Sequence, residues 1–235
     1  MKIFHTENAG VYLRTETTGL LIDGVHGGAS VGFSPMAPEE IRQIESREGI
    51  FSRLDGLLFT HLHIDHFQAK KVTELMRHYP DLAIWGPNLE RRHLMDYVEE
   101  GEDVRFRIGD LTVFAIRTEH SGKPFQKEPH MSLLITDEKG ENVFISGDAA
   151  FYPEQAERVR EISGGIDAIF IMIYQLIETG SRHFLNALRP RRILLYHKPR
   201  PEEDKNGLLP LTEKVLRNPS FAGVTIEVPE PHSWI

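Results

Sequence analysis

The sequence lacks cysteine altogether across its 235 residues. Disulfide bonds, a thiolate nucleophile and zinc ligation through sulfur are therefore excluded. Positive charge is also scarce, with 27 Lys and Arg against 35 Asp and Glu and a formal net charge of -8. Binding to phosphate backbones and anionic membranes depends on clustered Lys and Arg. We therefore expect no membrane partner, and the charge balance argues against nucleic acid.

Long apolar runs are missing as well. No segment approaches the roughly 18 consecutive apolar residues that span a membrane, and residues 1–15 lack the apolar stretch of a secretory signal peptide. We therefore expect a soluble, cytoplasmic protein. The hydrophobic fraction of 40% suffices for one sizeable core. Because no Pro/Ser-rich linker or repeat interrupts the chain, we expect a single domain over residues 1–235.

Segments with strand-like and helix-like patterns alternate along the chain. We predict strands at 1–4, 11–14, 20–23, 57–60, 82–85, 104–108, 111–117, 131–136, 143–146, 166–173, 193–196 and 224–228. We predict helices at 38–50, 67–79, 88–99, 153–162, 181–188 and 208–216. Such alternation is typical of α/β folds, in which helices cover the outer faces of the sheets.

The most distinctive motif follows directly after the predicted strand 57–60. His61, His63, Asp65 and His66 lie within six residues of one another. Neutral imidazoles and carboxylates are ligands for zinc, and also for iron and manganese. A loop that leaves the end of a strand can direct such side chains into one crevice, where α/β folds place their sites. We interpret the motif as part of a metal site.

Three other predicted strands end in the same kind of residue. His120 follows strand 111–117, Asp148 follows strand 143–146, and His197 follows strand 193–196. Each residue alone would be interpreted as a hydrogen-bonded loop residue. Because the carboxyl edges of several strands can converge on one mouth, we predict that these three complete the metal site.

The motif at residues 60–66, followed by His120, Asp148 and His197 in that order, resembles the metallo-β-lactamase superfamily. Asp23, which follows three apolar residues, also matches an aspartate found early in that family. The resemblance covers nearly the whole chain. It implies an α/β fold, a four-layer αβ/βα sandwich of two facing mixed sheets with outer helices.

The resemblance also implies two divalent metal ions, zinc in the first place and manganese or iron as alternatives. The implied ligands are His61, His63 and His120 for one ion, Asp65, His66 and His197 for the other, and Asp148 as a bridge. Asp23 would orient a ligand histidine, and its alternative interpretation is a loop-capping aspartate. A hydroxide shared by the two ions would attack the substrate, and Asp65 would steer it and accept its proton as the catalytic residue.

Residues beyond the strand ends are expected to line the mouth of the site: His26, His130, Phe151, Tyr152, Tyr174, His183 and Lys198. Tyr152 could polarise a substrate carbonyl, as a tyrosine does in some lactonases of this family, or simply pack at a helix start. His183 could donate a proton to a leaving group, and Lys198 could attract a carboxylate or phosphate. The histidines at positions 5, 78, 93 and 232 are expected to be ordinary surface or helix-end residues.

The sequence therefore predicts a metal-dependent hydrolase of a small-molecule substrate, which is expected to be an anionic ester, lactone or phosphodiester. Thioesters are less favoured, because Phe67 stands where thioesterases of this family have a glycine-rich step. One alternative is a nucleic-acid-processing phosphodiesterase of the same fold, which the net charge of -8 disfavours. The other is a non-enzymatic metal- or ligand-sensing module, against which the complete set of ligands argues.

Overall fold

The computed structural model describes residues 1–27, 32–217 and 224–235. Its first sheet has six strands in the order β15-β1-β2-β3-β4-β5. These strands are β1 Lys2–His5, β2 Val11–Arg14, β3 Gly19–Ile22, β4 Gly56–Leu58, β5 Ala83–Trp85 and β15 Ser233–Trp234. The pairs β3/β4 and β4/β5 are parallel, and the pairs β15/β1, β1/β2 and β2/β3 are antiparallel.

The second sheet follows the order β14-β13-β12-β10-β9-β8-β7-β6, with the short β11 paired to the end of β8. Its strands are β6 Met95–Glu100, β7 Asp103–Ile108, β8 Leu111–His120, β9 His130–Thr136, β10 Asn142–Ile145, β11 Ala149–Ala150, β12 Ala168–Ile171, β13 Arg192–Leu195 and β14 Thr225–Glu227. Strands β10, β12, β13 and β14 run parallel to one another.

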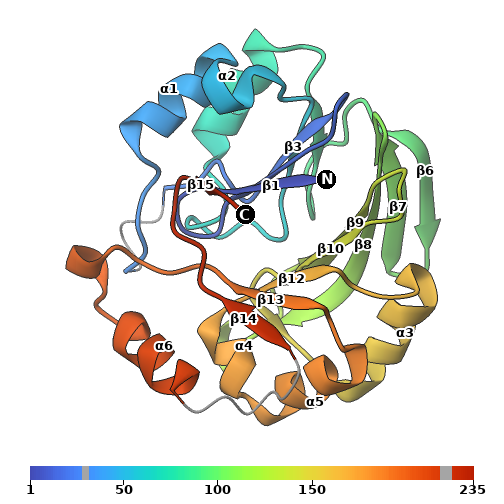
Figure 1. Cartoon of the computed structure of the whole chain (residues 1–235). Coiled ribbons are helices and arrows are strands. Elements are labelled where there is room, and N and C mark those ends of the chain that lie inside the picture. The colour runs from blue at the N-terminus through green and yellow to red at the C-terminus, as the bar shows by residue number, and fades with distance from the viewer. Residues whose placement is uncertain (28–31, 218–223) are drawn as a thin grey trace.

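Helices cover the outer face of each sheet, and the two sheets face each other (Figure 1). The helices beside the first sheet are α1 Pro38–Ser46 and α2 Ala69–His78. Those beside the second are α3 Pro153–Ser163, α4 Ile173–Ile177, α5 Thr179–Leu188 and α6 Leu208–Leu216. Short 3-10 helices lie at Gly49–Ser52, Lys123–Phe125 and Pro201–Glu203. The predicted four-layer αβ/βα sandwich is therefore confirmed.

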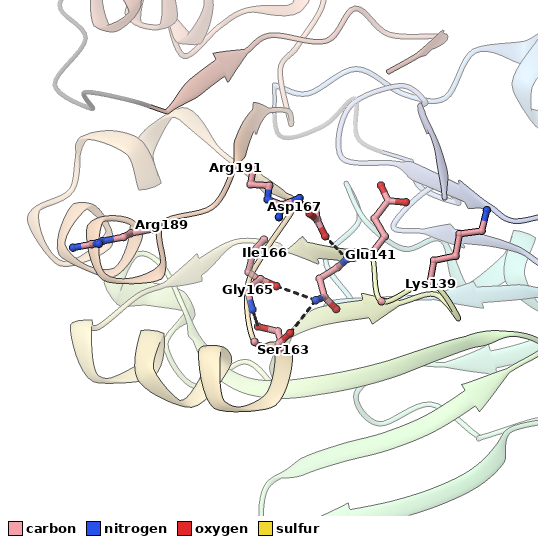
Figure 2. A pocket seen from close by; sticks show the side chains of 11 residues that line it. Lys139, Glu141, Ser163, Gly165, Ile166, Asp167, Arg189 and Arg191 are labelled. Carbon is pink, nitrogen blue, oxygen red and sulfur yellow. Dashed lines mark hydrogen bonds and ion pairs between the residues drawn. The ribbon is translucent and has the colours of Figure 1, made fainter.

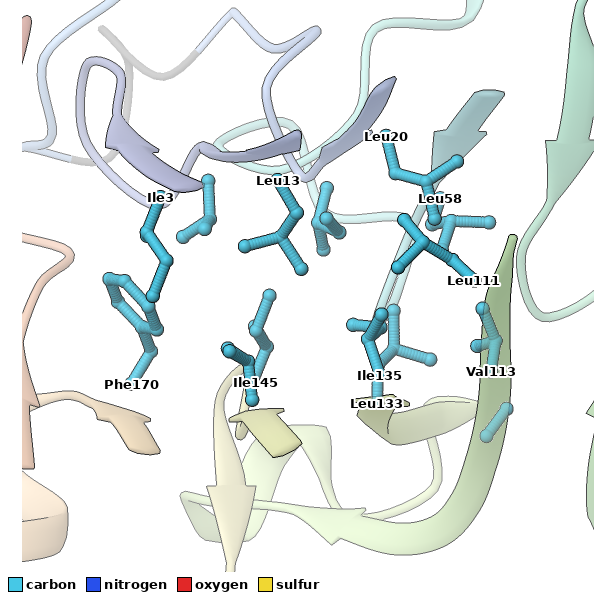
Figure 3. Close-up of a cluster of buried hydrophobic side chains, with 14 of the residues drawn as sticks. Ile3, Leu13, Leu20, Leu58, Leu111, Val113, Leu133, Ile135, Ile145 and Phe170 are labelled. Atoms are coloured by element: carbon cyan, nitrogen blue, oxygen red, sulfur yellow. The ribbon is translucent and has the colours of Figure 1, made fainter. Parts of the chain in front are cut away.

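The central core lies between the two sheets. Figure 3 shows side chains of the first sheet, such as Leu13 and Leu20, pointing toward Ile135 and Ile145 of the second. Leu21 is buried on the opposite face of β3, in the cluster that includes residues of α1 and α2. Because side chains alternate along a strand, a strand buried on both faces has to be apolar throughout.

The helix predicted for residues 88–99 is wrong. Met95–Glu100 instead forms β6, which pairs with β7 at the edge of the second sheet. His93 and Asp96 have positive φ angles of 54° and 49°, which are incompatible with a continuous right-handed helix. Backbone pairing with β7 thus outweighs the local helical pattern. The consecutive strands β7 and β8 form an antiparallel hairpin, as do β9 and β10.

The strand directions bring several strand ends to one edge of the sandwich. In the second sheet, β8 points the same way as β10 because β9 is antiparallel to both. The ends of β8, β10 and β13 therefore lie at one edge, where the side chains that follow them can meet. No helix among residues 1–27, 32–217 and 224–235 is both long and apolar enough to cross a membrane.

Candidate metal centre

The His61–His66 motif forms a tight turn immediately beyond β4. The backbone N–H groups of His66 and Phe67 donate to the carbonyl oxygen of His63, at 3.0 and 2.8 Å. Leu62 is partly buried against the cluster under α1 and α2, as expected for a residue that anchors the loop. Ile64, the other apolar residue between the histidines, does not anchor the loop in this way, because its side chain is 47% exposed.

Two groups of side chains with metal-ligand chemistry lie in this region, and within each group the ligand atoms are within 4.8 Å of one another. The first group consists of His61, His63 and His120, and the second consists of Asp65, His66, Asp148 and His197. The structure thus brings together all seven residues predicted from the sequence. Their role as ligands remains a prediction.

The first group joins the motif to the end of β8. Nε2 of His120 lies 3.1 Å from Nδ1 of His63. Nε2 of His61 is buried and has no hydrogen-bond partner among the described residues. A buried polar atom without a partner is costly. A metal ion would satisfy it, so this donor set fits a cation.

The second group joins the motif to the ends of β10 and β13. Nε2 of His66 lies 2.8 Å from Nε2 of His197, and Oδ2 of Asp65 lies 3.5 Å from the same atom of His197. Asp148 reaches both groups, because its Oδ1 is 3.2 Å from Nε2 of His66 and its Oδ2 is 3.6 Å from Nε2 of His120. This is the placement that a bridging carboxylate needs.

Hydrogen bonds to the outer nitrogens of three imidazoles fix their orientation. Nδ1 of His66 lies 3.0 Å from Oδ2 of Asp23, and Nδ1 of His61 lies 3.0 Å from Oγ1 of Thr60. Nδ1 of His120 lies 2.6 Å from the carbonyl oxygen of Ser121. We assign the proton to Nδ1 in each ring, since each partner can accept it. This tautomer leaves the Nε2 lone pair free for a metal ion.

Asp23 therefore contacts a ligand histidine, and a second partner, Thr60, was not predicted. The Thr60 hydroxyl and backbone N–H both donate to the Asp23 carboxylate, at 2.6 and 2.8 Å. Thr60 was interpreted only as the end of a strand. A threonine directly before a ligand histidine, opposite an early buried aspartate, was the available signal.

The charges in the second group are strongly coupled. Burial alone would raise the pKa of Asp148, but His66 and His197 hold it well below its ordinary value. Burial alone would lower the pKa of His66, but the Asp148 and Asp23 carboxylates raise it well above its ordinary value. Burial lowers the pKa of His61 and of His197. Without a metal ion, the site thus presents neutral His61 and His197, an ionised Asp148 and a doubly protonated His66, whose proton on Nε2 a metal ion would replace.

His130 was predicted to line the mouth of the site. It instead supports the backbone of Asp148. It is fully buried, and its Nε2 accepts the Asp148 backbone N–H at 3.0 Å. Its Nδ1 lies 2.7 Å from the Thr118 hydroxyl. Burial lowers the pKa of His130 to about 3, so the ring is neutral and can act as this acceptor. Gly147, with φ of 59°, passes so close that a Cβ there would lie 2.6 Å from His130 Nε2.

Of four other residues predicted to line the mouth, two are buried and two are exposed. His26 is buried, with Nε2 3.3 Å from the Glu7 carbonyl oxygen, and Phe151 is also buried, so neither is a mouth residue. Tyr152 is 39% exposed and Tyr174 is 38% exposed.

The remaining candidates are not seen in contact with the metal ligands. The Tyr152 hydroxyl donates to Glu119 at 2.9 Å, and this hydrogen bond raises the pKa of Tyr152. His183 is exposed on α5. Burial lowers the pKa of Lys198, and its electrostatic partner is Glu230.

Among the described residues, a hollow of about 850 Å³ lies at the other end of the second sheet. Residues that precede β12 and β13, such as Asp167 and Arg191, line it (Figure 2), whereas the metal ligands follow strand ends. Arg191 pairs with Asp167 at 2.8 Å. A smaller hollow of about 100 Å³ lies directly beside His61 and His63, against the segment of Pro87.

Comparisons with known proteins give the same family. Residues 18–197 match the model of the beta-lactamase superfamily domain. No curated protein matches the sequence. A similar solved structure is CmlA, a diiron beta-hydroxylase from Streptomyces venezuelae, with a TM-score of 0.64 and 16% identity. That match covers 100% of this chain but 53% of CmlA, so the chain spans about half its length.

Two further similar structures are hydrolytic or RNA-processing proteins by name. Isothiocyanate hydrolase from Delia radicum gut bacteria has a TM-score of 0.62 and 15% identity, with 100% of this chain and 98% of that chain covered. The short form of human tRNase Z has a TM-score of 0.57 and 14% identity, with 100% and 98% covered. At these identities the likeness shows the fold alone. With the family match over residues 18–197 and the His/Asp cluster, the chain belongs to the metallo-β-lactamase superfamily.

Proposed function

We propose that this protein is a binuclear metal-dependent hydrolase of a small ester, lactone or phosphodiester. The observation that carries the proposal is the pair of ligand groups, with Asp148 within 3.2 Å of His66 in one and 3.6 Å of His120 in the other. Two divalent ions held there would supply an activated water and a Lewis acid for the substrate oxygen. Zinc suits the imidazole and carboxylate donors best, and manganese and iron are the alternatives.

The chain's own residues orient the metal-binding imidazoles and accept a proton from the attacking water. Asp23 and Thr60 hold the His66 and His61 rings in the orientation described above. Asp65 has one carboxylate oxygen 3.5 Å from His197 Nε2, so its other oxygen is available to orient a water and accept its proton. We therefore assign Asp65 the role of general base.

Exposed apolar side chains at the mouth support an organic substrate. The Phe125 ring centroid lies 5.1 Å from the His63 ring and 5.3 Å from the His120 ring, although Phe125 is 46% exposed. Ile64, next to His63, is 47% exposed. Apolar residues around a few convergent polar groups are typical of small-molecule sites. We infer that the substrate carries an apolar group beside the bond that is cleaved.

The anionic group expected on the substrate remains a prediction. Lys198 was considered as a residue that could attract this group, and the electrostatic partner of Lys198 is the carboxylate of Glu230. A nucleic-acid-processing function is the second candidate, and tRNase Z shows that this fold can host one. The net charge of -8 disfavours it for this chain.

The test is hydrolysis of a panel of aryl and alkyl esters, lactones, thioesters, phosphodiesters and β-lactams by protein loaded with zinc, manganese or iron. We expect metal-dependent turnover of an ester, lactone or phosphodiester, and its loss in Asp65→Ala with the fold intact by circular dichroism. Glu102→Ala, an exposed carboxylate in the turn before β7, is the matched control and should retain activity. Turnover retained in Asp65→Ala would refute its assigned role. A loaded protein that hydrolyses nothing would favour the sensing module.

A further inference from the structure

The turn between β1 and β2 touches the second ligand group from behind. Asn8 is fully buried and has a left-handed backbone with φ of 58°. Its side-chain Nδ2 donates to the carbonyl oxygen of Asp65 at 2.9 Å, and its own carbonyl oxygen accepts the His197 backbone N–H at 3.0 Å. Asp65 follows a strand of the first sheet and His197 follows a strand of the second. One residue therefore joins the two halves of the ligand group.

The preceding residue, Glu7, ties this turn to the C-terminal segment. Its side chain is 3% exposed, and its Oε2 lies 3.2 Å from Nε2 of His232. Nδ1 of the same ring lies 3.4 Å from Oε1 of Glu40 on α1, which is also 3% exposed. Buried carboxylates need a charged partner to offset their desolvation. The neighbouring carboxylates of Glu40 and Glu7 raise the pKa of His232 to about 10, so the ring is a cation at neutral pH.

Sheet pairing fixes the C-terminal segment beside the turn. Trp234 and Ser233 of β15 pair with Phe4 and His5 of β1. Figure 1 shows the chain leaving β14 in the second sheet and ending beside β1 in the first. The family match ends at residue 197 and begins at residue 18, so the turn and the segment both lie outside it.

We propose that the C-terminal segment 230–235 is a strap that positions the second ligand group through Asn8. His232 forms ion pairs with Glu7 and Glu40, and these contacts keep the Glu7–Asn8 turn packed against the backbones of Asp65 and His197. The inference rests on the proposed function, because it takes these two residues as ligands. His232 and Asn8 are positioning residues, since neither side chain is among the ligand groups.

If the strap positions the second ligand group, loss of its contacts should weaken the binding of the ion at that group only. Release of the turn would leave Asp65 and His197 free to separate, whereas His61, His63 and His120 have no contact with it among the hydrogen bonds of the described residues. Loss of a residue that orients metal ligands typically weakens metal binding about 10- to 100-fold. We therefore expect the weaker binding to appear in the second ion alone.

The experiment is a Co²⁺ titration of the full-length, metal-free protein, followed by visible absorption, for wild type, His232→Gln, Asn8→Gly and the double variant. Glycine is chosen because it accepts the positive φ at position 8. His78→Gln, an exposed histidine at the end of α2, is the matched control. We expect His232→Gln and Asn8→Gly each to weaken the second Co²⁺ about 10-fold and to leave the first unchanged. Because both substitutions act through one turn, the double variant should bind the second Co²⁺ as tightly as the single variant with the lower affinity.

Four results would overturn the strap, and the last of them would refute the proposed function as well. Unchanged binding of the second ion in His232→Gln, with two ions bound by wild type, would refute the strap alone. Equal weakening of both ions would show a general defect of the fold rather than positioning. Fully additive effects in the double variant would show that His232 and Asn8 act separately. A wild type that binds only one ion would instead refute the binuclear site of the proposed function, and the strap with it.

Discussion

Asp23→Asn replaces one oxygen of the buried carboxylate that holds His66 and Thr60. The carboxylate accepts three hydrogen bonds, from the Thr60 N–H at 2.8 Å, the Thr60 hydroxyl at 2.6 Å and His66 Nδ1 at 3.0 Å. An asparagine has one acceptor oxygen, so if that oxygen keeps the Thr60 N–H, its NH₂ group faces the other two. An NH₂ donor opposite His66 favours the tautomer with the proton on Nε2. That proton occupies the atom that would bind the metal ion.

The magnitude follows from these contacts. A buried donor left without its acceptor costs about 1–3 kcal/mol of folding stability. A change of the group that orients a metal-bound histidine costs about 10- to 100-fold in metal affinity, or about 1.4–2.8 kcal/mol. We therefore expect Asp23→Asn to lower the midpoint of thermal unfolding by several degrees and to weaken zinc binding at the second ligand group at least 10-fold.

Isothermal titration with Zn²⁺ and calorimetric unfolding of the metal-free protein measure the two effects separately. Asp55→Asn is the control, because Asp55 also accepts a backbone N–H, from Gly19 at 2.8 Å, but precedes β4 at the opposite end from the ligands. This control should leave zinc affinity unchanged. If Asp23→Asn bound zinc as tightly as wild type, the tautomer argument would be refuted.

Two further predictions follow from the same site. Gly147→Ala places a Cβ 2.6 Å from His130 at φ of 59°, so we expect the free energy of unfolding, measured with denaturant, to fall by about 3 kcal/mol. The control Gly140→Ala, with φ of 78° and nothing within 4 Å of the added Cβ, should lower it by only about 1 kcal/mol. Equal losses in the two variants would contradict the steric overlap at position 147. The pKa of His66 is raised well above its ordinary value without metal, so metal uptake must release this proton. Metal affinity should therefore rise with pH, and titration in buffers of different ionisation enthalpy should show proton release; an affinity independent of pH would contradict it.

The fold and the grouping of the seven candidate ligands were predictable because both follow from local patterns. Apolar segments marked the strands, and parallel strands end at a common edge. Residues directly after those ends, such as His120, Asp148 and His197, could therefore be grouped without coordinates. The helix predicted for residues 88–99 was wrong because β6 is an edge strand whose residues are almost all exposed, apolar Met95 and Val98 included. Its pairing with β7 is a property of the sheet, and the exposure of both faces leaves no clear strand pattern in the sequence.

Apart from Asp23, which the family resemblance indicated, the supporting residues were not predictable, because their partners are distant in the sequence. Asn8 contacts Asp65 and His197, and nothing in the local sequence of the β1–β2 turn indicates either. His5 was expected at the surface and is 1% exposed, so that prediction is wrong. His232 was also interpreted as an ordinary surface residue, yet its ring lies against two buried carboxylates. A histidine's chemistry depends on the groups that pack around it, and packing requires the fold.

The central claim is that two groups of side chains hold two ions in a hydrolase. Elemental analysis of the purified protein after reconstitution tests it most directly, because it counts metal without reference to any substrate. We expect close to two divalent ions per chain, since Asp148 lies within reach of both ligand groups. A stoichiometry of one ion or fewer per chain would contradict it.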